Sequence, residues 1–303
     1  MARIVLYSFF LCWLSYGVSQ NKYVESKLFC EGNILKHLRS LSSDAFEGRR
    51  TGTKGGLKAQ KYIINQFFAL NVKPLVKDYR QPFRFVHKGS YYNGVNILGC
   101  IKGTLFPSEY IVISAHYDHE GINQGEIFNG ADDNASGVSA LFAFGEYFRQ
   151  NPPKHSVILA AFDAEELDIQ GSKYYMKNPV VKLENIVLNL NMDMISRSDQ
   201  QELFVAGTSY NTQLKALFKE EVYSTNINLL LGHDGYDGLD NWTYASDHVN
   251  FYKKGISFLY FGVEDHKDYH EPTDTFEKIH TKFYIESVRT IIKVFKSVDN
   301  LEF

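Results

Sequence analysis

The sequence lacks the features that mark nucleic-acid-binding and disulfide-rich proteins. Its 303 residues include only 3 cysteines and 7 prolines, and the formal net charge at pH 7 is −3. Acidic and basic residues are mixed along the chain, so we expect no binding of nucleic acid or of an anionic membrane surface. Only Cys30 and Cys100 follow the first 20 residues, and their wide spacing leaves both a disulfide and two free thiols open. Because no repeat and no Pro-, Gly- or Ser-rich linker divides the chain, we expect a single domain.

An apolar run lies at the N-terminus, from Ile4 to Leu14. A basic residue precedes the run and small residues follow it, namely Arg3, Gly17 and Ser19. This order is typical of a secretory signal, and the run is shorter than the roughly 20 residues that span a bilayer. We therefore expect a signal peptide over residues 1–20 and a secreted or periplasmic mature domain over residues 21–303, without stable membrane insertion.

The remaining sequence has enough apolar residues for a large core, since 44% of the chain is hydrophobic and 15% aromatic. Period-2 and short apolar runs predict strands at residues 92–101, 110–115, 156–162, 186–192, 202–206 and 257–261. Helical spacing predicts helices at residues 33–41, 54–70, 138–148, 172–177, 213–223 and 283–298. The first two strands are expected to be neighbours joined by a turn at 103–107. The alternation predicts an α/β fold with a mostly parallel central sheet and helices on both faces.

Polar residues gather where the predicted strands end, which is where open α/β sheets carry their sites. They are His116, Asp118, Asp132, Asp133, Asp163, Glu165, Glu166, Asp193 and His270. Carboxylates at the end of an apolar run are costly to desolvate unless they are paired or hold a cation. A mixture of imidazole and carboxylate ligands without a thiolate suits Zn²⁺ in a catalytic site.

Each of these residues also has a structural explanation when it is taken alone. Asp193 could be a turn or cap residue, and His270 could be a surface loop residue. Glu165 and Glu166 could form the acidic first turn of a helix. All these explanations would have to hold together at successive strand ends, so a metal site is the better interpretation.

Five motifs occur in order along the chain: Ala115–Asp118, Gly130–Gly137, Ala164–Glu166, Asn191–Asp193 and Tyr269–Thr275. Together they resemble the zinc aminopeptidases of the M28 peptidase clan, which use two zinc ions bridged by water. The resemblance extends to Leu41–Arg49, Asn96–Gly99 and Ser246–His248, so it covers most of the chain after the signal.

The resemblance implies a role for each polar residue and two Zn²⁺ ions per chain. Asp132 looks like the carboxylate that bridges both metals and precedes a cis peptide bond to Asp133. The remaining ligands would be His116 and Asp193 for one zinc, and Glu166 and His270 for the other. Asp118 would accept the other N–H of the His116 ring, and Glu165 would be the general base.

His119 is an alternative ligand, because it lies three residues after His116. On an extended segment residues three apart point to opposite faces, so we favour His116.

These roles imply a metallo-aminopeptidase that hydrolyses N-terminal residues from peptides with a free N-terminus, which we expect to act as a monomer. The same family contains single-zinc glutaminyl cyclases, and the paired acids favour hydrolysis over that alternative. A non-catalytic, zinc-stabilised binding module is disfavoured, since structural zinc sites are closed. The substrate pocket is expected between loops 231–244 and 246–251, whose Trp242, Tyr244 and Phe251 weakly favour an apolar N-terminal residue.

Overall fold

Buried apolar strands form the centre of the molecule in the computed structural model, which describes residues 28–220, 223–224 and 226–303. β7 is buried at every position, and β4 is buried from Ile111 onward, as expected for strands covered on both faces. The strands are β1 (Lys73–Pro74), β2 (Arg80–His87), β3 (Ser90–Ile101), β4 (Phe106–His116), β5 (Gly121–Asn123), β6 (Glu126–Phe128), β7 (His155–Phe162), β8 (Ile186–Met192), β9 (Glu202–Ala206), β10 (Asn228–Leu231) and β11 (Ser257–Gly262).

The main sheet has nine strands in the order β1-β3-β7-β4-β8-β11-β9-β10, with β2 paired to β3. Strands β7, β4, β8 and β11 are parallel, whereas β3 and β9 run antiparallel to their neighbours β7 and β11. The α/β fold with a mostly parallel sheet is therefore confirmed. The expected pairing of β3 with β4 is wrong, because the fully buried β7 lies between them and pairs with both.

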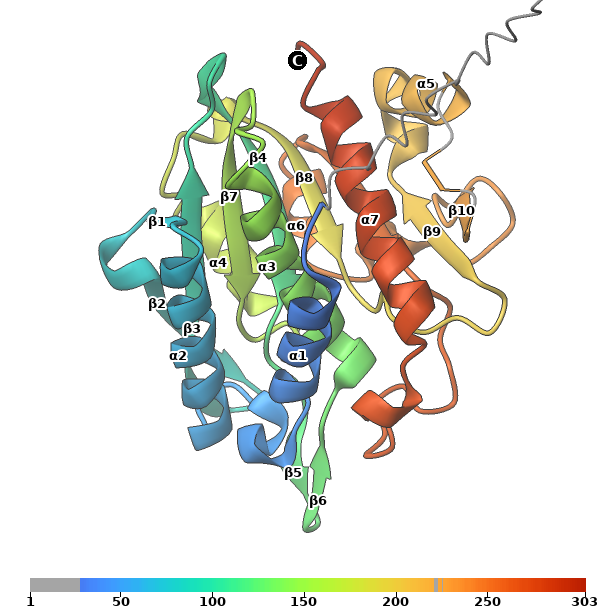
Figure 1. Ribbon diagram of the computed structural model, residues 1–303. Helices are drawn as coiled ribbons and strands as arrows, with labels where there is room; N and C mark the ends of the chain where they lie inside the picture. Colours follow the sequence, from blue (N-terminus) through green and yellow to red (C-terminus); the bar gives the residue numbers. More distant parts are fainter. Residues whose placement is uncertain (1–27, 221–222, 225) are drawn as a thin grey trace, which may run out of the picture.

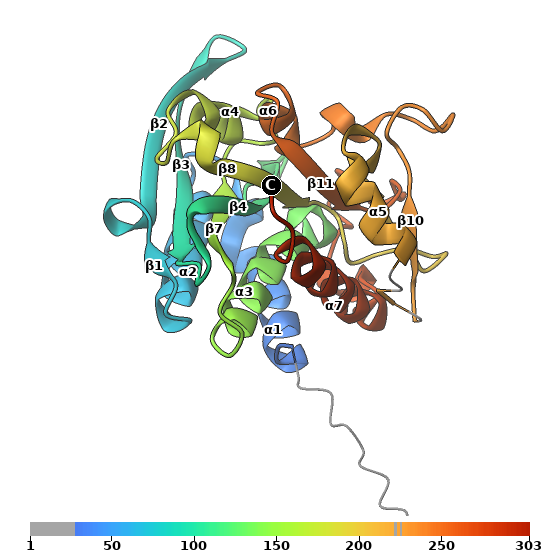
Figure 2. The same cartoon turned by 90° about the horizontal axis from the view of Figure 1, so that it is seen from above.

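Helices cover both faces of the sheet (Figures 1 and 2). One face carries α1 (Glu31–Leu41), α2 (Lys54–Ala69), α3 (Gly137–Phe148) and α7 (Thr281–Val298), with α5 (Thr212–Glu220) packed beside α7. The other face carries α4 (Gln170–Lys177) and the short α6 (His248–Tyr252). Each helix presents an apolar stripe to the sheet, and these stripes form the two main core clusters.

The parallel strands bring four loops to one edge of the sheet. Cα pairing aligns His116 at the end of β4 with Phe162 at the end of β7, and Phe261 of β11 with Met192 of β8. The residues that follow these positions therefore meet at the same edge, near the β5–β6 hairpin at the bottom of Figure 1. The candidate site lies there.

Two other expectations concern the cysteines and the membrane. Cys30 is exposed and Cys100 half-buried, and both are free thiols. Among the described helices, none is both long enough and apolar enough to cross a bilayer. The expected signal peptide, residues 1–20, lies outside the described residues.

Candidate metal centre

His116 lies beside two carboxylates at the carboxyl end of β4. Its Nε2 atom is 3.2 Å from Asp133 Oδ1 and 3.2 Å from Asp193 Oδ1. Asp193 directly follows β8, and Asp133 belongs to the loop that precedes α3. All three side chains are buried, so bulk water does not solvate this cluster.

His270 forms a second cluster with the opposite oxygen of the same aspartate. Its Nε2 atom is 3.2 Å from Asp133 Oδ2 and 3.2 Å from Glu166 Oε2. Glu120 also approaches Glu166 and His270, but its carboxylate is paired with Arg50 at 3.1 Å. Asp133 therefore faces one imidazole with each of its two oxygens.

These distances fit a pair of zinc ions that share one carboxylate. Zinc binds nitrogen and oxygen ligands at about 2.0–2.2 Å, so two ligands of a tetrahedral ion are separated by roughly 3.3 Å. The four imidazole–carboxylate separations of 3.2 Å match that spacing. One cluster would be His116, Asp193 and Asp133 Oδ1, and the other His270, Glu166 and Asp133 Oδ2.

The charge of the site also calls for cations, because four carboxylates face three imidazoles, namely Asp133, Glu165, Glu166 and Asp193 against His116, His119 and His270. Burial alone lowers the pKa of His270, but hydrogen bonds to Asp133 and Glu166 outweigh it and raise that pKa to about 11. Burial likewise lowers the pKa of His116, and the nearby Asp193 and Glu165 raise it well above its ordinary value. In the absence of a metal the carboxylates thus hold protons on the imidazoles of His116 and His270, which a bound metal would displace.

The structure contradicts the expectation that Asp132 bridges the metals. Its Oδ1 atom accepts hydrogen bonds of 2.7 Å from both the backbone N–H and the hydroxyl of Ser196, and Oδ2 is 3.1 Å from His266 Nε2. Asp133 is instead the aspartate whose two oxygens face the two imidazoles, His116 and His270. The cis peptide bond also lies one residue later than expected, between Asp133 and Asn134.

Asp274 orients this loop from the far end of the chain. Its carboxylate accepts the backbone N–H groups of Asp132, at 3.0 and 3.1 Å, and of Asp133, at 3.1 Å. With both amides fixed, the two adjacent aspartates point in different directions. Because the loop is irregular, sequence periodicity does not indicate which of Asp132 and Asp133 faces the two imidazoles.

Asp118 has a different contact from the one expected. Its Oδ1 atom is 3.7 Å from His116 Nδ1, which instead faces the backbone carbonyl of Asp118 at 3.2 Å. The Asp118 carboxylate accepts the backbone N–H groups of Glu165 at 3.0 Å and Glu166 at 3.3 Å. Asp118 therefore fixes the turn that carries both glutamates rather than the imidazole ring.

The two adjacent glutamates face different surroundings. Glu166 lies between His270 and His119, and although burial and Asp133 raise its pKa, the two imidazoles hold it at about 2. Glu165 lines the central cavity, and burial raises its pKa well above the ordinary range. Surroundings that push two carboxyl pKa values apart are typical of an acid–base group beside a permanently ionised one.

His119 is a member of the cluster that the sequence argument discounted. It is fully buried, its Nδ1 atom is 2.7 Å from Glu166 Oε1, and its ring lies 3.7 Å from Asp133 Oδ2. The opposite-face argument fails because β4 ends at His116 and the chain turns. Gly130, at φ 54°, makes room for the imidazole, since a Cβ there would lie 2.5 Å from the ring.

Arg49 joins the loops around the site from within the core. Its side chain is only 1% exposed, and burial lowers the pKa of its guanidinium to about 10. The guanidinium donates to five backbone carbonyls, those of Leu41, Tyr117, Asn129, Gly130 and Asp133. The five N–H donors of a guanidinium can bind carbonyls of several segments at once. A lysine ammonium has only three donors at a single nitrogen and cannot make the same contacts.

Replacing Arg49 by Lys should therefore lower the free energy of unfolding by about 3 kcal/mol or more, because buried carbonyls lose their donors. The same substitution at Arg50, whose half-exposed side chain pairs with Glu120, should lower it by less than about 1 kcal/mol. Urea unfolding of the two variants and the parent protein measures both values. Equal losses in the two variants would contradict the role of Arg49.

A cavity of about 90 Å³ opens beside the clusters. It is lined by residues of the clusters and their neighbours, namely His116, Asp133, Glu165, Asp193, Met194, Trp242, Ala245, Tyr260, Val263, Asp265, Tyr269 and His270. The expected wall residue Trp242 is thus present. Tyr244 is not among the lining residues, and the expectation for Phe251 is wrong, because it packs in the core against Phe162 and Tyr175.

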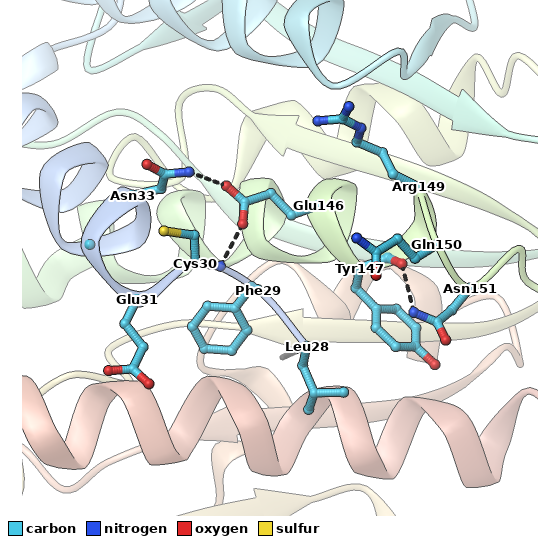
Figure 3. Close-up of a pocket in the computed structure, with 11 residues that line it drawn as sticks. Leu28, Phe29, Cys30, Glu31, Asn33, Glu146, Tyr147, Arg149, Gln150 and Asn151 are labelled. Atoms are coloured by element: carbon cyan, nitrogen blue, oxygen red, sulfur yellow. Dashed lines mark hydrogen bonds between the residues drawn. The ribbon is translucent and has the colours of Figure 1, made fainter. Parts of the chain in front are cut away.

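A larger cavity, of about 580 Å³, lies elsewhere (Figure 3). It is lined by the start of α1 and the end of α3, where Glu146 accepts hydrogen bonds from the Cys30 backbone N–H and the Asn33 side chain. This is the opposite end of α3 from the ligand loop. The Glu146 carboxylate of this cavity is already hydrogen-bonded to Cys30 and Asn33. We therefore assign the chemistry to the smaller cavity, which borders the two clusters.

The chain is similar to known zinc peptidases in sequence and in fold. Aminopeptidase YwaD of Bacillus subtilis (strain 168) is 27% identical over 198 residues, which are 61% of this chain but only 40% of YwaD. The structure of BSAP, a zinc aminopeptidase from Bacillus subtilis, has a TM-score of 0.70 at 17% identity and covers 89% of this chain and 95% of that chain. Porphyromonas gingivalis glutaminyl cyclase also has a TM-score of 0.70, at 18% identity, covering 89% of this chain and 99% of that chain.

The fold is therefore shared by peptidases and cyclases, and the sequence profile decides the family. Residues 96–295 match the profile of peptidase family M28, which is more than half of the chain and includes the five residues of the two clusters and Glu165. From this match, the chain belongs to peptidase family M28, a zinc-dependent family of metallopeptidases.

Proposed function

We propose that the protein is an aminopeptidase that holds two zinc ions per chain and removes N-terminal residues from peptides. The observation that carries the proposal is the shared Asp133, whose two oxygens each complete a separate imidazole–carboxylate cluster. A structural zinc site has four protein ligands and no free position, whereas each cluster here has three and borders a cavity.

Zinc ions in this arrangement would lower the pKa of a bound water and polarise the peptide carbonyl. The residues of the chain supply the rest of the chemistry. Glu165 lies at the cavity beside His116 and Asp193, so its carboxylate can take the proton of the attacking water and pass it to the leaving amine. The carboxylates of Glu165 and Asp193 also suit a free α-amine, which restricts cleavage to the first residue.

The first test is metal content together with turnover. We expect the purified protein to contain about two zinc ions per chain and to hydrolyse aminoacyl anilides, and we expect chelators to abolish that activity. Because neutral imidazoles bind zinc, lowering the pH through the range where imidazoles and carboxylates protonate should release the metal and the activity together. Elemental analysis that finds no zinc above background contradicts the proposal.

Glutaminyl cyclisation is the second candidate, since the fold of the Porphyromonas gingivalis cyclase matches as closely as that of BSAP. Cyclisation of an N-terminal glutamine consumes no water and releases ammonia, so a glutaminyl peptide distinguishes the two activities by mass spectrometry. Asp193 lies 3.2 Å from His116, so the chain has the residues for two metal ions rather than one. This supports hydrolysis over cyclisation.

We further propose that the protein is exported and acts as a monomer on peptides outside the cytoplasm. The supporting observation is the signal-like pattern of residues 1–20. N-terminal sequencing of the protein from its native cells should find a start near Gln20, and an intact Met1 would contradict export.

A further inference from the structure

One carboxylate of the substrate cavity has no role in the two metal clusters. Among the described residues that line the cavity, Asp265 is the only charged side chain apart from the ligands and Glu165. Within the described part of the chain, its carboxylate has no hydrogen bond or ion pair. Its side chain is exposed at the mouth of the cavity; partial burial and the neighbouring charge of Asp240 raise its pKa, whereas His266 and His270 lower it.

The two neighbouring acids are already engaged. Asp240 accepts hydrogen bonds of 2.7 Å from the Trp242 indole N–H and from His233 Nδ1. Glu264 lies 3.2 Å from His233 Nε2. Asp265 differs from both, because the imidazoles that offset its charge are His266, which pairs with Asp132, and His270.

The apolar residues that line the cavity with Asp265 suit a long aliphatic chain. Trp242 stacks on His233 with ring centroids 3.5 Å apart, so its indole is held in one orientation. Tyr269 stacks on His270 at 4.0 Å, and Met194 and Val263 complete an apolar wall. Lysine and arginine lay their methylene stems along such walls and keep the charged end at a polar group, and aromatic faces also attract the cation.

From this arrangement we propose that the cavity selects peptides whose first residue is lysine or arginine, with Asp265 pairing with the side-chain cation. This inference rests on the proposed aminopeptidase function. It replaces the weak apolar preference expected from the sequence, because only one of the three aromatics expected there, Trp242, lines the cavity.

Lysyl and norleucyl p-nitroanilides test the proposal, since norleucine resembles lysine without its ammonium group. We expect kcat/KM to be about tenfold or more higher for the lysyl substrate, and Asp265→Asn should bring the ratio close to one while norleucyl turnover changes little. Glu264→Gln removes the same charge one residue away and should leave the ratio nearly unchanged. Arginyl and leucyl anilides repeat the comparison with a second pair.

The outcomes separate the inference from the proposed function. Rapid norleucyl and leucyl hydrolysis without a lysyl preference, or a preference that survives Asp265→Asn, overturns the role of Asp265 and leaves aminopeptidase activity intact. An equal loss of preference in Glu264→Gln also overturns it, because the effect would then come from overall charge. Failure to hydrolyse any of the four anilides overturns the proposed function itself.

Discussion

Glu165→Gln should lower kcat by roughly 10²–10⁴, the usual effect of losing a general base, while the zinc content stays at the parent level. Glutamine keeps the shape and hydrogen-bonding capacity of the side chain but cannot take a proton from water. Because Glu165 lines the cavity and contributes no oxygen to either cluster, the metals should remain bound. Turnover of an aminoacyl anilide and elemental analysis of the same preparation measure both effects.

Glu166 is the matched control, since it is the next residue and carries the same functional group. Glu166→Gln removes a carboxylate that lies 3.2 Å from His270 and 2.7 Å from His119, so zinc occupancy should fall together with turnover. If both glutamates were only the acidic start of a turn, either substitution would lower stability by about 1 kcal/mol and change turnover little. Full activity in Glu165→Gln ends the general-base assignment, whatever its metal content.

Asp133→Asn should lower zinc affinity by more than roughly 10²-fold and reduce activity accordingly, because even residues that only orient metal ligands are worth 10–100-fold. Asparagine has one oxygen and no charge, so it cannot serve both clusters at once. Zinc titration of the metal-free protein, followed by turnover at saturating zinc, measures affinity and activity separately.

Asp132→Asn is the control for this prediction and tests the correction that the structure makes. The Asp132 carboxylate accepts three hydrogen bonds, from Ser196 and His266, and asparagine would lose at least one of these acceptors. We expect a loss of about 1–3 kcal/mol in unfolding free energy and near-parent zinc affinity. If Asp132→Asn lost zinc and Asp133→Asn kept it, the original sequence assignment would be right.

The central strands and the long helices were predictable because each has a strong periodic signal. Strand β7 is apolar from Val157 onward and β8 is apolar except for two asparagines, and α2 and α7 begin within two residues of the expected position. The sheet order was not predictable, since nothing local shows that β7 inserts between β3 and β4. Strand β2 was missed because it is an edge strand that includes Pro82 and alternates exposed residues with buried ones.

The sequence argument assigned the shared carboxylate to Asp132, one residue before Asp133, whose oxygens face both imidazoles in the structure. Strand ends identified which loops carry ligands, because that follows from the parallel sheet. The direction of each side chain within an irregular loop depends on distant contacts such as that of Asp274 with the amides of Asp132 and Asp133. Arg49 was not singled out for the same reason, since hydropathy patterns do not reveal a buried guanidinium that binds carbonyls from three separate segments of the chain.

The contact between Asp274 and the bridging loop also determines when the protein can become active during synthesis. The two partners are 142 and 141 residues apart, and His270 lies on the same late loop. Ribosomal synthesis delivers the N-terminal part of a chain first, and contacts of high sequence separation form slowly. A nascent chain that already contains His116 and both glutamates thus has neither the second imidazole nor the carboxylate that orients Asp133. The proposed peptidase activity can therefore begin only after the loop that carries His270 and Asp274 has been made.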